Sequence, residues 1–555
     1  MGKLRMLPLL LVLLLWRLGV GVAWGQTPAP PELTRLFPAG APRGQSTMIQ
    51  VQGKFDAESV KVWTSAAGLS WSKREGDGQF QVEIPSDVEP GPIWLRLVDQ
   101  GGASEVLPFV IGHHPEITET EPNDRSDQAP KVPELPIVIN GVLQSGGDVD
   151  HFGLSLRSGQ QLVAFLDAER FLKSAVDATL QLVTTEGQIL AQNLDHRGLD
   201  PQLVWVADRD IDVVLRVFGF PAAPDSTISL GGGEKFIYRL GVTTGTLVEA
   251  VEPLAFDRQQ SLRYARHGWN QTADTLFEVP SSAERESVRL FWPDALGQFE
   301  LPVLPHPSKL ARDLRLPESR LATADESAMA IELPITITGR LLEPRQTDDF
   351  LVRVPADKQW RIQVEAHKLG YAWDPCLEVW DPSVGTRLHR QDDQGSGMDP
   401  DWVWAPGAGV YQLRVFDLHG HDVPHQWYRL TITEQRPEVK LTVGKTSFRG
   451  QIGEVLDIPV TLDRRHGHTA EVEFGLVSLD AAVENSLTLE PVRSVAGDDS
   501  AKQVVLKVSG SEIFSGPVRL LAWEKDTPER KHAILESSTG LDQLWLTFGA
   551  AVAGE

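Results

Sequence analysis

Cysteine is almost absent from this sequence of 555 residues. The single cysteine, Cys376, excludes any disulfide within the chain, so stability must come from core burial, protected sheet edges or bound ions. Positive charge is also scarce, because 52 lysines and arginines face 76 aspartates and glutamates, which leaves a formal net charge of −24 at pH 7. This balance disfavours nucleic acid and anionic membranes as partners. It suits divalent cations, although acidity alone more often indicates only solubility.

Long apolar runs are confined to the first residues. Two basic residues precede an apolar stretch at 7–16, and small residues follow it, which is the pattern of a secretory signal peptide cleaved after Gly25. The stretch is shorter than the roughly 20 apolar residues that span a membrane, and Arg17 ends it. We therefore expect 1–25 to be a signal peptide, no transmembrane segment after its cleavage, and a location that is secreted, periplasmic or at the cell surface.

Catalytic motifs are also missing. The sequence has neither HExxH nor GxSxG, and "GKT" at 444–446 lacks the upstream glycine of a phosphate loop because position 439 is valine. "GGGEK" at 231–235 precedes a strand-like run rather than a helix, so it lacks the helix N-terminus that phosphate binding uses. We therefore expect no catalytic residues, while an enzyme with an unrecognised site stays as one alternative.

An internal repeat is the strongest feature that is present. "LPIVINGVLQSGGDVDHFGLSL" at 135–156 returns 198 residues later as "LPITITGRLLEPRQTDDFLVRV" at 333–354, and both units close on "YRL", at Tyr238 and Tyr428. Apolar and polar residues alternate in runs of five to eight, separated by Gly, Asp and Pro, whereas helical periodicity is rare. Each unit is therefore predicted to be an antiparallel β-sandwich of about seven to nine strands.

Shorter β-patterned segments precede each repeat unit, and a further one follows the second. The predicted fold class is all-β, a multi-domain chain of antiparallel β-sandwiches of immunoglobulin-like and jelly-roll-like kinds. The expected divisions are a small immunoglobulin-like module, the first repeat unit, a second and degenerate immunoglobulin-like module, the second repeat unit and a C-terminal sandwich, at 31–112, 116–245, 246–318, 325–435 and 436–550.

The first repeat unit resembles the bacterial pre-peptidase C-terminal (PPC) domain. The motifs that carry the resemblance are "EPND" at 121–124, "GDVDHF" at 147–152 and "DATLQL" at 177–182. The second unit looks like the same domain with "EPND" lost and "DDF" retained, and the first module resembles a TIG/IPT immunoglobulin-like module. The whole arrangement is similar to large exported proteins of planctomycete bacteria. The resemblance implies β-sandwiches and an accessory, non-catalytic role.

The stretch "ETEPND" at 119–124 is a candidate metal-binding linker. Pro122 biases Glu121 toward extended geometry, and an extended chain places alternate side chains on one side. Glu119, Glu121 and Asn123 would then face the same way, with Asp124 adjacent. Such a row offers the hard oxygen donors that calcium requires. The alternative is an acidic linker with a turn at Asn123 and Asp124.

Further oxygen donors are expected from the sandwich that follows, and we infer Asp148 and Asp150 of "GDVD" as the best placed. In PPC-like collagen-binding domains the Glu-x-Glu-x-Asn-Asp linker binds calcium, so the resemblance implies Ca²⁺ ligands at Glu119, Glu121, Asn123 and Asp124. The second unit has "PESRLA" at 317–322 in the aligned place, and its lone Glu318 cannot build such a site.

Weaker candidates lie in the second half of the chain. The aspartates of "QDDQGSGMDPD" at 391–401 could hold a cation, but they fit a turn as well. The histidines of "HGHDVPH" at 419–425 and "RRHGHT" at 464–469 are expected to be solvated. Trp402 and Trp404 share one face of a predicted strand, where they could stack on sugar rings or pack into the core.

These observations predict a non-catalytic, modular binding or adhesion scaffold outside the cell. Its partner would be an extracellular protein or a polysaccharide, and the calcium ion would dock the 119–124 linker onto its sandwich. One alternative is an accessory region or partner of an exported peptidase or other hydrolase, and the other is the unrecognised enzyme named above. The sequence predicts no particular oligomeric state.

Overall fold

The structure is a computed structural model. It describes residues 28–550 except for 224–228, 272–275, 282–286, 304–308, 313–328, 396, 421–425, 481–485 and 530. The predicted signal peptide at 1–25 lies outside the described residues. Within the described part of the chain, no helix has the length and apolar character needed to cross a membrane.

The described residues form nine β-sheets, and their only α-helix is the short α1 (Glu169–Leu172). Some strands alternate buried and more exposed side chains as the period-two pattern predicted, for example β28 (Trp360–Glu365) and β40 (Gln503–Gly510). Others, such as β33 (Gln426–Glu434), are buried along nearly their whole length. Pairs of sheets face each other across apolar cores in four of the five segments. The prediction of an all-β chain of antiparallel sandwiches is therefore confirmed.

The first module packs a four-stranded sheet, in the order β1-β3-β6-β5, against a five-stranded sheet built on β2-β9-β7-β4. Phe80, Val82 and Ile84 alternate with outward residues on β6 and enter the core between the sheets. The strands are β1 (Glu32–Phe37), β2 (Gly40–Pro42), β3 (Gln45–Lys54), β4 (Lys61–Thr64), β5 (Ser70–Lys73), β6 (Gln79–Ile84), β7 (Gly91–Asp99), β8 (Gly102–Ala103) and β9 (Leu107–Gly112).

The first repeat unit has nine strands in two sheets, in the orders β10-β11-β18-β13-β16 and β12-β17-β14-β15. The repeated motif supplies β11 and β12, and the "YRL" motif lies on β18, which pairs with β11. The strands are β10 (Glu116–Thr118), β11 (Ile137–Val142), β12 (Asp150–Leu156), β13 (Gln161–Asp167), β14 (Val176–Thr184), β15 (Ile189–Asn193), β16 (Gln202–Val206), β17 (Ile211–Pro221) and β18 (Ile237–Thr243).

The middle module differs from the predicted immunoglobulin-like fold, because its described residues form a single five-stranded sheet. Neighbours complete its burial: Leu247 and Leu296 pack on the first repeat unit, while Leu254 joins the core of the second. A sheet buried by other modules needs no second sheet of its own. The strands are β19 (Thr246–Glu252), β20 (Leu262–Trp269), β21 (Leu276–Val279), β22 (Ser287–Trp292) and β23 (Ala295–Pro302).

The second repeat unit reproduces the first, with sheets in the orders β24-β26-β33-β28-β31 and β25-β27-β32-β29-β30. Its β26, β27 and β33 correspond to β11, β12 and β18. The strands are β24 (Lys309–Arg312), β25 (Ile331–Glu332), β26 (Ile335–Leu341), β27 (Thr347–Val354), β28 (Trp360–Glu365), β29 (Pro375–Asp381), β30 (Thr386–Gln391), β31 (Asp401–Trp404), β32 (Gly409–Asp417) and β33 (Gln426–Glu434).

The C-terminal sandwich has sheets in the orders β38-β40-β36-β34-β43 and β35-β44-β41-β37-β39, with β42 beside β41. The strands are β34 (Glu438–Val443), β35 (Ser447–Gln451), β36 (Val455–Arg465), β37 (Val472–Ser478), β38 (Leu487–Leu489), β39 (Arg493–Ser494), β40 (Gln503–Gly510), β41 (Phe514–Glu524), β42 (His532–Ala533), β43 (Leu535–Glu536) and β44 (Leu544–Gly549).

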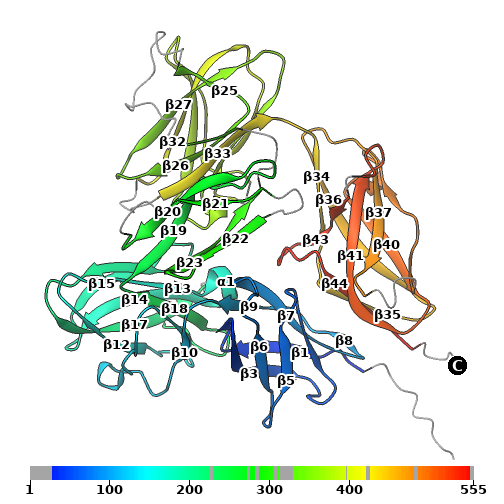
Figure 1. Cartoon of the computed structure of the whole chain (residues 1–555). Coiled ribbons are helices and arrows are strands. Elements are labelled where there is room, and N and C mark those ends of the chain that lie inside the picture. The colour runs from blue at the N-terminus through cyan, green and yellow to red at the C-terminus, as the bar shows by residue number, and fades with distance from the viewer. Residues whose placement is uncertain are drawn as a thin grey trace, which may run out of the picture.

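The modules close into a ring, because the C-terminal sandwich returns to the first module (Figure 1). Arg96 donates from Nη1 to the Thr446 carbonyl oxygen at 3.0 Å, across 350 residues of sequence. Trp63 and Trp545 meet edge to face with ring centroids 6.2 Å apart, inside a small apolar cluster of both modules. The order of modules along the sequence therefore does not produce an extended string.

Candidate metal centre

The acidic linker is attached to the edge of the first repeat unit by strand pairing. β10 runs parallel to β11, with Glu116 opposite Val138, and Glu119 N donates to the Asn140 carbonyl oxygen at 3.0 Å just beyond the strand. This pairing continues the sheet by one edge strand and directs the 119–124 segment over the start of β12. The linker is therefore fixed by main-chain hydrogen bonds before any ion is considered.

Three carboxylates converge beneath this linker. Glu121, Asp148 and Asp150 each contribute an oxygen, and these oxygens lie within 4.8 Å of one another. Asp150 starts β12 and is fully buried, and Asp148 in the preceding turn is 6% exposed. No other group of three or more acidic, histidine or cysteine side chains in the described part of the chain comes this close together.

One oxygen of this cluster has no internal partner. Asp148 Oδ2 accepts a hydrogen bond from Gln144 N, but Asp148 Oδ1 is buried without a hydrogen-bond partner among the described residues. A buried charged oxygen without a donor is costly, so the arrangement calls for a proton or a cation.

Asn123 completes the inner group. Its amide is fully buried and lies 3.1 Å from Glu121 Oε2 and 2.9 Å from Asp150 Oδ1. With its nitrogen toward these oxygens, the amide donates to both. With its oxygen toward them, it becomes a further oxygen ligand beside the three carboxylates. The same side chain therefore suits either a cation-free or a cation-bound cluster.

Glu119 and Asp124 lie at the margins of the group. Glu119 Oε1 accepts from Val142 N at 2.7 Å, and its Oε2 lies 3.1 Å from the Tyr238 hydroxyl oxygen. Asp124 is exposed beside Asp148. The structure thus brings four of the six predicted residues together, Glu121, Asn123, Asp148 and Asp150, and leaves Glu119 and Asp124 at the margin.

Tyr238 is a member of the site that sequence reasoning missed. Its buried hydroxyl lies 2.6 Å from Asp150 Oδ2 as well as near Glu119, yet it has a single hydrogen to donate. The ring crosses Gly141, where a Cβ atom would come within 2.2 Å of the ring. The glycine and the tyrosine recur in both repeats, at Gly339 and Tyr428, and this recurrence was the available signal.

Burial and mutual repulsion raise the pKa values of these carboxyl groups. Burial, reinforced by Asp150, raises the pKa of Glu119 to about 9. Burial raises the pKa of Asp150 to about 7, with Asp148 and Glu121 adding to the shift. The pKa of Asp148 rises to about 6 for the same reason, with Asp124 and Glu121 as neighbours. A cation among them would favour the ionised forms.

The donor set favours a hard cation. All the converging side-chain ligands are oxygens, and the nearest histidine, His151, uses Nδ1 toward the Asn123 and Val149 carbonyl oxygens and Nε2 toward Arg216. Carboxylate and amide oxygens suit calcium, which takes six to eight of them in flexible geometry, better than they suit zinc. The residues present therefore fit a calcium ion.

The other candidate clusters are used in local structure. Asp399 accepts hydrogen bonds from Ala366 N, His367 N and Lys368 N, while Asp401 pairs with Arg361 at 2.6 Å. His468 is buried 2.9 Å from Glu524, so the expectation that it is solvated is wrong. His421 and His425 lie outside the described residues. The linker segment of the second unit at 317–322, with Glu318, also lies outside them.

Trp402 and Trp404 share one face of β31, as predicted, but their ring faces are occupied. They stack on each other at 5.3 Å, and Trp402 stacks on His389 at 3.8 Å with an interplanar angle of 7°. Both tryptophans are half-buried against the core of the second unit. The packing interpretation is therefore the better one for this pair.

Comparison with known proteins identifies no family. No family model and no curated protein matches the chain. Among solved structures, the fibronectin(III)-like modules of Clostridium thermocellum CbhA share 12% identity over 39% of this chain and 97% of that chain, with a TM-score of 0.14. Surface layer protein SbsC, domains 1–6, shares 9% identity over 94% of this chain and 54% of that chain, with a TM-score of 0.15.

A third solved structure is the Bacteroides ovatus protein SGBP-B of a mixed-linkage glucan utilization locus, in complex with a mixed-linkage heptasaccharide. It shares 9% identity over 73% of this chain and 74% of that chain, with a TM-score of 0.15. All three likenesses are low. The fold assignment therefore depends on the strands of this chain alone, and its function on the chemistry of its residues.

Proposed function

We propose that the protein is an exported, non-catalytic binding scaffold whose first repeat unit, a PPC-like domain, is stiffened by a bound calcium ion. The observation that carries the proposal is the convergence of Glu121, Asp148 and Asp150 around a buried Asp148 oxygen that lacks a hydrogen-bond partner within the described residues. Calcium would supply the missing positive charge and replace a proton as the partner of that oxygen.

The ion would fix the position of the linker and, through it, the angle to the first module. Glu121 and Asn123 belong to the linker, while Asp148 and Asp150 belong to the sandwich, so a shared ion would hold the two together. Glu116, at the base of the same linker, binds Arg239 through a bidentate ion pair with distances of 2.7 and 3.0 Å. Linker, sandwich and module junction would then move as one body.

The binding partner is proposed to be an extracellular protein or a polysaccharide. A cleft of about 810 Å³ between the second repeat unit and the C-terminal sandwich offers a place for it. Lys368, Lys440 and His466 line this cleft beside Trp402. Pull-down with immobilised polysaccharides or collagen supports this role, whereas co-purification with an exported hydrolase would favour the accessory alternative.

The test is calcium titration of the mature chain by calorimetry, followed by thermal melting. Calcium at a hundred times its dissociation constant should stabilise the native state by about 2.7 kcal/mol. The Glu121→Gln/Asp148→Asn variant should show neither heat nor stabilisation. Asp348→Asn, at the position of the second unit that matches Asp150, is the matched control and should bind calcium as the wild type does. The absence of heat and of any melting shift at millimolar calcium in the wild type would contradict the proposal.

A further inference from the structure

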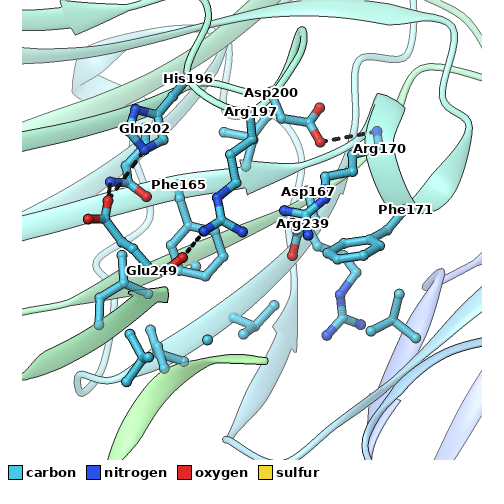
Figure 2. Close-up of a pocket in the computed structure, with 18 of the residues that line it drawn as sticks. Phe165, Asp167, Arg170, Phe171, His196, Arg197, Asp200, Gln202, Arg239 and Glu249 are labelled. Atoms are coloured by element: carbon cyan, nitrogen blue, oxygen red, sulfur yellow. Dashed lines mark hydrogen bonds and ion pairs between the residues drawn. The ribbon is translucent and has the colours of Figure 1, made fainter. Parts of the chain in front are cut away.

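A partly open cavity lies where the first module, the first repeat unit and the middle module meet (Figure 2). Its volume is about 80 Å³. Since one water position takes about 10–15 Å³ by this measure, the space accommodates roughly five to eight non-hydrogen atoms. Gly112 and His114 come from the first module, Asp167 and Arg170 from the repeat unit, and Leu296 from the middle module.

Most polar groups of the cavity wall already have partners. Gln202 and His196 both contact Glu249 Oε1, and Arg197 donates to the Glu249 carbonyl oxygen (Figure 2). Asp200 accepts hydrogen bonds from three consecutive main-chain N–H groups that begin at Ala168. These contacts join this part of the wall into one hydrogen-bonded framework.

Two opposite charges on the wall differ from this pattern. Within the described part of the chain, neither the Asp167 carboxylate nor the Arg170 guanidinium has a direct side-chain hydrogen bond or ion pair, although both line the cavity. The two act on each other only at longer range, and Arg197 and Arg239 act on Asp167 in the same way. Arg170 lies over the Phe171 ring at 4.3 Å. Burial raises the pKa of Asp167, and burial together with Arg197 lowers the pKa of Arg170 to about 10. Each group would gain from a ligand of opposite charge.

The second repeat unit shows how this position is otherwise satisfied. Glu365 faces Arg429 across β28 and β33, and the two form an ion pair with an N–O distance of 2.6 Å. Asp167 faces Arg239 in the same register, but Arg239 is bound to Glu116 instead. Arg239 therefore makes its direct ion pair with Glu116 and acts on Asp167 only at longer range, so the Asp167 carboxylate on the cavity wall has no direct ion pair among the described residues.

We propose that this cavity binds a small zwitterion of the free α-amino acid class, with its carboxylate on Arg170 and its ammonium group on Asp167. A guanidinium matches a carboxylate in a bidentate manner, and an ammonium group is a compact donor for a carboxylate. A lone anion would face Asp167 without a partner for it. The volume best suits amino acids with short side chains, such as glycine, alanine and serine.

The cavity wall comes from three modules, so an amino acid bound there would join them. Its site does not involve the proposed calcium cluster, and either site can fail without the other. Ligand binding would be coupled to the arrangement of the modules, because a ligand that touches the repeat unit and fills space against Leu296 stabilises the closed junction.

The experiment is calorimetric titration of the mature chain with L-alanine and L-serine, with acetate, methylamine and glycerol as comparison probes. The amino acids are expected to bind at least tenfold more tightly than the comparison probes. Asp167→Asn and Arg170→Gln should each weaken L-alanine binding at least tenfold. Arg353→Gln, a control at a half-exposed arginine on β27 of the second unit that does not line the cavity, should leave the affinity unchanged.

Melting of each variant without ligand verifies that it is folded. If both cavity variants unfold, the wild-type comparison of L-alanine with acetate and methylamine decides, because only the zwitterion engages both charges. Equal binding of acetate or glycerol, equal affinity in the folded variants, or no heat with either amino acid at millimolar concentration would overturn the proposal.

Discussion

The two repeat units surround an equivalent buried aspartate, Asp150 or Asp348, with different side chains. In both, a tyrosine hydroxyl donates to a buried aspartate at 2.6 Å, Tyr238 to Asp150 and Tyr428 to Asp348. In the second unit Gln346 donates from its amide to the other oxygen of Asp348 at 2.8 Å. In the first unit the same position holds Asp148, which has no proton donor to offer when it is ionised.

The remaining oxygen of this position behaves alike in both units. Gln346 Oε1 accepts from Leu342 N, and Asp148 Oδ2 accepts from Gln144 N at the equivalent place in the turn. The substitution therefore removes one N–H donor and adds one carboxylate, with the backbone kept. At this position the second unit pairs Asp348 with an amide of its own, whereas in the first unit Asp148 Oδ1 has no hydrogen-bond partner among the described residues. If the proposed calcium ion binds there, the contrast teaches how a single side chain can separate a repeat that closes with an amide from one that binds a metal.

The largest expected difference between the units is their response to pH without calcium. The pKa values of Asp148, Asp150 and Glu119 in the folded unit, about 6, 7 and 9, exceed those near 4 in an unfolded chain. The folded state thus holds more protons, so this stability is present below pH 4 and is lost as pH rises from about 4 to 9. In EDTA, melting of the first unit should fall by at least about 5 °C between pH 5 and 9.

Hydrogen exchange of the two units, followed separately by mass spectrometry, checks this prediction. Saturating calcium should remove most of the pH dependence in the first unit, because the ion replaces the protons. Unchanged protection of the first unit across this pH range in EDTA would contradict the expectation.

The second largest effect is expected when the residues at this equivalent position, Asp148 and Gln346, are exchanged between the two units. Asp148→Gln should stabilise the first unit in EDTA by about 1–2 kcal/mol, because an amide donor replaces an unpartnered buried oxygen. It should also abolish calcium binding. Gln346→Asp should destabilise the second unit by about 1–3 kcal/mol, since it leaves Asp348 without its amide donor. Thermal melting of both variants with and without calcium measures these changes in stability. An Asp148→Gln protein that still binds calcium would contradict the prediction that an amide at this position replaces the ion.

The smallest effect is expected at the tyrosine pair. Tyr428→Phe removes the donor to Asp348 and should cost about 1–2 kcal/mol whatever the calcium concentration. Tyr238→Phe should cost a similar amount in EDTA but less in calcium, because the ion then compensates for the lost donor to Asp150. Denaturant unfolding of both variants, in EDTA and in calcium, measures these losses of stability. If calcium changed the loss equally in the two variants, the predicted difference between the units would be wrong.

The sequence predicted the local patterns and missed the long-range partners. Strand alternation and the internal repeat were enough to predict the sandwiches. The spacing of Asp148 and Asp150 was enough to predict two carboxylates at the start of one strand. Tyr238 was missed because its contact with Asp150 spans 88 residues and depends on which strands pair. The diversion of Arg239 to Glu116 was equally hidden, since both Arg239 and Arg429 belong to the same "YRL" motif.

Ring closure also sets how the molecule would bear tension. Pro28 and Ala550, the first and last described residues, line one groove between the first module and the C-terminal sandwich. A pull applied between these two points would load that single interface, with its Trp63 and Trp545 contact and its Arg96 hydrogen bond, before any other module. The ring would open there first, and the remaining modules would take up load only once it is open.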